Sequence, residues 1–86
     1  MAKKFTKVLL YPVIIEPCEE GGYFAYCPSI QGCHAEGENY SEAIENIEDV
    51  IKAHLEIRKK NKEFLPGVEI KKGTQITLNL PILVYE

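Results

Sequence analysis

The sequence lacks several features that would point directly to a class of protein. None of its apolar runs approaches the roughly 20 residues of a membrane-spanning helix. The longest, residues 8–15, is interrupted by Pro12. No small-residue cleavage site follows the basic N-terminus, so we expect a cytoplasmic protein with no membrane association. No repeat or low-complexity segment divides the 86 residues, which suffice for one domain, 1–86, with a single small core.

The sequence is also poor in groups that carry chemistry. Its three cysteines include no Cys-x-x-Cys pair, so neither a disulfide framework nor a zinc ribbon is favoured. Cys27, Cys33 and His34 are close in sequence, but alternation along a strand sends Cys33 and His34 to opposite faces. The neighbours Glu36 and Glu38 are acidic, which is the wrong environment for an activated thiol. We therefore predict no catalytic, cofactor-binding or metal-binding residue.

Groups that recognise nucleic acid are scarce as well. Gly21 and Gly22 precede a strand-like run rather than a helix, so they do not form a phosphate-binding loop. Arg58 is the single arginine, and the net charge is −3. This balance disfavours non-specific binding to nucleic acid.

What the sequence does contain predicts a small α+β domain. Three segments are rich in β-branched and aromatic residues and are predicted strands: residues 4–15, 23–27 and 33–37. The intervening segments, 16–22 and 28–32, carry proline and glycine and are predicted turns. The first two strands are apolar on both faces, which requires cover on both sides.

The hydrophobic period then changes to that of a helix. Apolar residues recur at three- and four-residue spacing, at Ile44, Ile47, Val50 or Ile51, and His54 or Leu55. Asn39, followed three residues later by Glu42, is a variant of a capping box and marks the helix start, with Ser41 as a competing N-cap. Residues 61–67 end the helix.

The remainder, residues 66–86, is predicted to be a strand-rich C-terminal extension. In residues 75–80, Ile76, Leu78 and Leu80 alternate with Thr77 and Asn79, which is typical of a half-buried strand. The order is therefore β-β-β-α-β, with one helix packed on a small sheet. Because one helix covers only one face of a sheet, we expect a homodimer or higher homo-oligomer that buries the other face.

The order of motifs in the middle of the chain resembles that of the HicB-like antitoxin family. The motifs are residues 21–33 (GGYFAYCPSIQGC), residues 37–39 (GEN) and residues 42–47 (EAIENI). The resemblance covers roughly residues 8–57 and implies a degenerate ribonuclease-H-like, two-layer fold. Many members carry a further C-terminal DNA-binding segment. This sequence resembles a short form, with only residues 63–86 after the helix, so DNA binding is not favoured.

The resemblance implies a non-enzymatic antitoxin that binds a small basic HicA-like toxin, an mRNA-cleaving ribonuclease, and neutralises it by direct contact. The acidic first half of the helix and the net charge of −3 would steer such a partner. The candidate contacts are polar or aromatic residues of the hairpin, turn and helix: Glu19, Glu20, Tyr23, Ser29, Gln31, His34, Glu42, Glu45 and Asp49.

Two other functions stay open at this point. The first is a stand-alone oligomer that binds a ligand or RNA without any toxin, with Tyr23, Phe24 and Tyr26 as a stacking platform. The second is a hydrolase built on Cys33 or His34. A small basic reading frame beside the gene would favour the antitoxin over the first of these.

Overall fold

The computed structural model describes residues 7–86. In this part of the chain one long helix, α1, spans Tyr40–Lys60 and begins at the predicted cap. The side-chain oxygen of Asn39 accepts a hydrogen bond from the Glu42 N–H at 2.9 Å. The Glu42 carboxylate in turn accepts from the Glu38 N–H, also at 2.9 Å, one residue earlier than in an ordinary capping box. The competing cap, Ser41, lies inside the helix.

Three antiparallel strands form the sheet on which α1 packs. They are β2 (Ile14–Pro17), β3 (Tyr23–Tyr26) and β4 (His34–Gly37), in the order β2-β3-β4. The predicted second and third strands are thus confirmed to within one residue. Gly21 and Gly22 close the first hairpin with φ values of +101° and +78°, which side chains rarely adopt.

The predicted first strand is wrong as a single element. Within residues 4–15 the structure has β1 (Leu9–Leu10) and the start of β2, separated at residues 11–13. Pro12 has no N–H to donate to a ladder, and this explains the break. β1 pairs with β5 (Val68–Glu69) in a separate two-stranded sheet. Residues 4–6 of the prediction lie outside the described residues.

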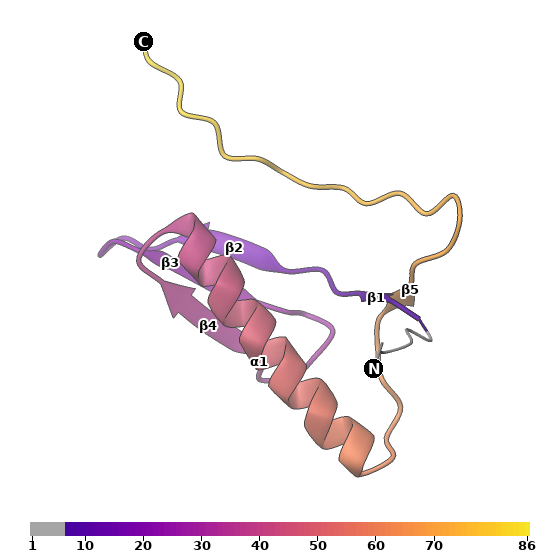
Figure 1. The fold of residues 1–86 in the computed structure, drawn as a ribbon. Coiled ribbons are helices and arrows are strands. Elements are labelled where there is room, and N and C mark those ends of the chain that lie inside the picture. The colour runs from indigo at the N-terminus through magenta and orange to yellow at the C-terminus, as the bar shows by residue number, and fades with distance from the viewer. Residues whose placement is uncertain (1–6) are drawn as a thin grey trace, which may run out of the picture.

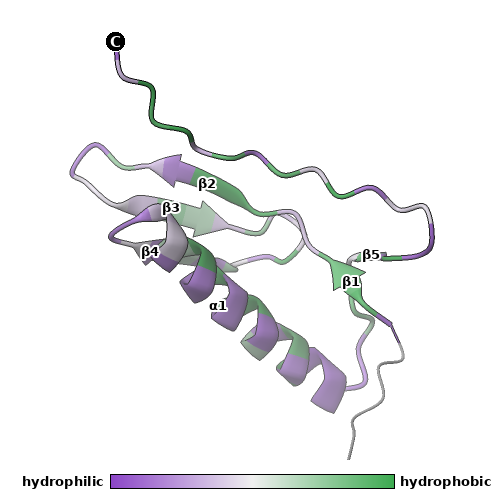
Figure 2. Ribbon diagram, turned by 45° about the horizontal axis from the view of Figure 1, so that its top comes forward, coloured by the Kyte–Doolittle hydropathy of each residue, from purple (hydrophilic) through white to green (hydrophobic). Residues whose placement is uncertain are grey.

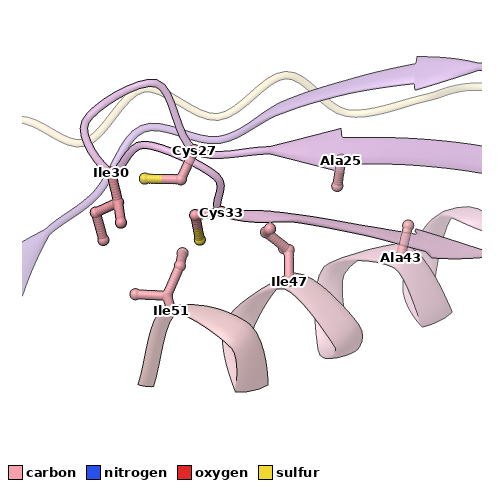
Figure 3. Close-up of a cluster of buried hydrophobic side chains, with 7 residues drawn as sticks. All are labelled: Ala25, Cys27, Ile30, Cys33, Ala43, Ile47 and Ile51. Atoms are coloured by element: carbon pink, nitrogen blue, oxygen red, sulfur yellow. The ribbon is translucent and has the colours of Figure 1, made fainter. Parts of the chain in front are cut away.

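The core lies between α1 and the inner face of the three-stranded sheet. Its seven buried residues come from β3, the connection between β3 and β4, and the helix (Figure 3): Ala25, Cys27, Ile30, Cys33, Ala43, Ile47 and Ile51. The helical members recur every four residues. Ile47 and Ile51 were predicted from the helical period, but the predicted first member, Ile44, is exposed, and Ala43 is buried in its place. The molecule is thus a two-layer α+β domain with its helix on one face of the sheet (Figure 1).

The chain after Ile70, whose N–H still donates to the Val8 carbonyl beside β1, does not join either sheet. Residues 75–80, predicted to be a half-buried strand, form no strand and are exposed. Both views show the segment running outside the body of the domain (Figures 1 and 2). Alternation shows that a segment could bury one face, but a strand also needs a neighbour for its backbone, and here it has none within residues 7–86.

No helix in the described part of the chain combines the length and the hydropathy needed to cross a membrane.

Candidate partner-binding surface

Phe24 and Tyr26 lie on the face of the sheet that the helix does not cover. Ala25, between them, is fully buried in the core, so its two neighbours point the other way. The Phe24 ring lies 5.8 Å from that of Tyr26 and 5.7 Å from that of His34, with the last pair nearly parallel at 29°. Three rings from two adjacent strands therefore form one platform.

Carboxylates stand beside this platform. In the strand register Phe24 lies directly between Glu16 on β2 and Glu36 on β4. Side chains of directly paired residues share a face of the sheet. We call the residues of this face the outer face; in register they form two rows, Ile14, Tyr26 and His34, and Glu16, Phe24 and Glu36.

An acidic hollow opens at the end of the sheet next to the outer face. It lies where the β2–β3 turn meets the start of α1, and its carboxylates are those of Glu20, Glu36, Glu38 and Glu42. Glu36 belongs to both surfaces. We use the name acidic hollow for the region around these four residues.

Two glycines bring the walls of the acidic hollow together. A Cβ on Gly22 would lie 2.9 Å from the carbonyl oxygen of Gly37. A Cβ on Gly37 would lie 2.3 Å from the backbone nitrogen of Ala43. Only glycine permits the hairpin, β4 and the helix N-terminus to approach this closely.

The predicted contact residues do not form one site. Glu20, Tyr23 and Glu42 line the acidic hollow, whereas Gln31 and His34 line a shallow depression at the other end of β3 and β4. The remaining four are exposed at scattered positions in the two turns and on α1: Glu19, Ser29, Glu45 and Asp49. The positions of these residues in the sequence did not indicate that they lie at opposite ends of the sheet.

Tyr23 does not share a platform with Phe24 and Tyr26. It lies on the helix side of β3, packs against the core and meets the Tyr40 ring edge to face at 6.1 Å. The predicted platform of Tyr23, Phe24 and Tyr26 is therefore wrong. The third ring beside Phe24 and Tyr26 is that of His34. Strict alternation along residues 23–26 would have separated Tyr23 from the other two.

Glu16 and Glu36 are the residues that sequence reasoning did not select as contacts. Their signal was available in principle. The hairpin closed at Gly21 and Gly22 sets the register that aligns Glu16 with Phe24, and the turn between β3 and β4 sets the register that aligns Glu36 with Phe24. Without the observed register, however, they were two carboxylates at predicted strand ends.

The thiols and His34 are arranged as alternation requires. Cys27 and Cys33 are buried in the core, while His34 is exposed on the outer face. Burial, the adjacent Cys27 and a side-chain hydrogen bond with it raise the pKa of the Cys33 thiol above its ordinary value of 9.0. No three potential ligands among residues 7–86 converge in a way that could hold a metal ion. Cys33 is thus placed as a packing residue.

We expect Cys33 to resist alkylation in the folded protein. Its raised pKa reduces the thiolate fraction, and burial blocks access, so iodoacetamide at pH 8 should modify it at least tenfold more slowly than in urea (order of magnitude). Peptide mass spectrometry measures both rates, with the half-buried Cys18 as the internal control. The Cys33 thiol loses its proton at a lower pH in the unfolded chain than in the folded protein. Its ionisation therefore lowers the free energy of unfolding as the pH rises above 9.0. Equal labelling of Cys33 with and without urea would contradict the assignment.

Comparison with known proteins agrees with the order of motifs in the chain. Residues 11–76 match the family described as the HicB-like antitoxin of bacterial toxin-antitoxin systems. A UPF0150 protein of Synechocystis is 44% identical over 46 residues, covering 54% of this chain and 58% of that protein. A UPF0150 protein of Archaeoglobus fulgidus is 33% identical over 67 residues, covering 73% and 97%.

One relative carries the family's functional name. Antitoxin HicB 1 of Photorhabdus laumondii is 37% identical over 60 residues, which cover 70% of this chain and 39% of that antitoxin. The matched region therefore spans less than half of the longer relative. With the family match extending across most of residues 7–86, the chain belongs to the HicB-like antitoxin family of bacterial toxin-antitoxin systems.

Proposed function

We propose that this chain is the antitoxin of a type II toxin-antitoxin system and that it neutralises a small basic, HicA-like mRNA-cleaving toxin by direct contact. The observation that carries the proposal is the outer face: a platform of three rings, uncovered by the helix and flanked by Glu16 and Glu36. It adjoins the acidic hollow, which adds further negative charge.

The chemistry of the outer face suits a basic protein. An arginine or lysine side chain can lie on an aromatic ring and reach a carboxylate beside it, and such contacts contribute about 0.5–2 kcal/mol each. RNA would place phosphates near the same carboxylates, and like charges repel. The outer face therefore favours the antitoxin over the alternative of a stand-alone RNA-binding oligomer.

The proposal includes a non-enzymatic role in the cytoplasm. Three antiparallel strands followed by a helix on one face agree with a degenerate ribonuclease-H-like fold, which we include as part of the proposal. Such a fold brings no activity by itself, since activity resides in particular residues.

Co-expression with a small basic protein encoded beside the gene tests the function. We expect the antitoxin to relieve growth arrest caused by that protein, to co-purify with it, and to prevent its cleavage of mRNA in vitro. An unrelated ribonuclease toxin serves as the control and should be unaffected.

Two results would overturn the proposal. One is the absence of both a complex and relief of growth arrest. The other is tight binding of a single-stranded RNA oligonucleotide by the chain alone at physiological salt, which would favour the RNA-binding alternative.

A further inference from the structure

The segment after the Lys71–Thr74 turn is unusually apolar for an exposed stretch. Seven of its large apolar side chains are 63% to 89% exposed: Ile76, Leu78, Leu80, Ile82, Leu83, Val84 and Tyr85. Figure 2 shows this run of hydrophobic residues outside the body of the domain. We call residues 75–86 the tail. Soluble monomers rarely expose a continuous apolar segment of this size.

The domain also carries an unused surface that matches the tail. In the part of the chain that the structure describes, β2 is at the edge of its sheet and has β3 as its only neighbour. Such an edge presents unpaired backbone groups that can accept another strand. Beside it runs an apolar groove between β2 and α1, lined among others by Val13, Ile15, Ile44, Ile47, Ile51 and Leu55.

The tail of the same chain uses this surface only in part. Thr77 and Leu78 reach the groove, and the Tyr40 hydroxyl donates to the Asn79 carbonyl at 3.4 Å. No strand pairing forms, and residues 82–86 continue away from the body (Figure 1). Contacts within one chain therefore leave most of the apolar surface of the tail uncovered.

We propose that the tail docks on the β2 edge and groove of a second copy of this chain, and that the exchange is reciprocal. A second copy supplies the same unpaired β2 edge and the same exposed tail, so one two-fold arrangement covers both. Paired as a strand in that arrangement, the tail would turn Ile76, Leu78 and Leu80 toward the groove and Thr77 and Asn79 toward solvent, as their alternation requires.

Charge supports a second copy rather than a basic toxin as the occupant. The tail has no charged residue from Gln75 to Tyr85. The two charged side chains at the groove, Glu48 and Lys52, form an ion pair with each other at 3.4 Å. An uncharged segment meets a groove with no net charge, whereas a basic partner would find no complementary charge there.

Sedimentation equilibrium of variants of the 86-residue chain tests the exchange. The wild type should be a dimer of about twice 9.8 kDa. Leu78→Asp in the tail and Ile44→Glu in the groove should each raise the dimer dissociation constant at least tenfold (order of magnitude), since each introduces a charge into buried apolar contact. The matched controls, Gln75→Asp at the start of the tail and outside the groove, and Ile57→Glu elsewhere on α1, should leave it unchanged.

Mixing the two defective chains distinguishes exchange from other interfaces. The Leu78→Asp chain keeps an intact groove, and the Ile44→Glu chain keeps an intact tail. We expect a heterodimer that is tighter than either homodimer, because one intact tail meets one intact groove. A wild-type monomer, a dimer unaffected by Leu78→Asp, or no preference for the heterodimer would overturn the proposal. Circular dichroism checks that each variant is folded, and no toxin is needed.

Discussion

Gly37→Ala is expected to lower the free energy of unfolding by about 3 kcal/mol, which is the upper end of the usual cost of overpacking. The added Cβ would lie 2.3 Å from the backbone nitrogen of Ala43 and 2.8 Å from its Cα. Both atoms belong to the first turn of α1, so no flexible side chain can move aside. Either β4 or the helix must shift, and Ala43 would leave its fully buried position.

Urea unfolding followed by circular dichroism at 222 nm measures this change. Gly21→Ala is the matched control, because its Cβ would meet nothing within 4 Å. Gly21→Ala should lower the free energy of unfolding only by the cost of holding an alanine at positive φ, about 1–2 kcal/mol. If Gly37→Ala were no more destabilising than Gly21→Ala, the close approach of β4 and α1 would not be a determinant of stability.

Phe24→Ala is expected to weaken the complex with the proposed toxin by about a hundredfold, which corresponds to the loss of an aromatic residue at the centre of an interface. Phe24 contacts both other rings of the outer face and stands between two carboxylates. Its removal takes away the middle of the platform without touching the core on the opposite side of β3.

Phe64→Ala provides the control for this substitution. Phe64 is 84% exposed and lies after the helix, away from the outer face, so its removal should leave the affinity unchanged. Isothermal titration calorimetry with the purified toxin measures both variants, and urea unfolding shows whether either loses stability. Wild-type affinity in a folded Phe24→Ala protein would exclude the outer face as the binding surface.

Local features of the fold were predictable because they depend on neighbours in sequence. The Asn39 cap requires only the residue three positions later, and the Gly21-Gly22 turn requires only a backbone with positive φ. The helical stripe through Ile47 and Ile51 follows from the period of the helix. The match of residues 11–76 to the family confirms the resemblance recognised from the order of motifs.

The candidate site was less predictable, since it depends on register and on which face the helix covers. From sequence, Tyr23 and Phe24 are two adjacent aromatic residues. In the structure one packs on the core with Tyr40, and the other stacks on His34. Glu16 and Glu36 join Phe24 only through pairing of three strands.

By itself, then, the sequence determined the β3–β4–α1 unit, its buried stripe and its family, because hydrophobic period, turn residues and capping act over a few positions. Only the tertiary structure decided that the chain breaks at Pro12, that β1 pairs with β5, and that the tail lies unpaired beside the edge of β2. Those outcomes depend on which backbone groups meet across long separations in the chain. An alternating pattern indicates that one face of a segment tends to be buried, but it does not indicate which other segment covers that face.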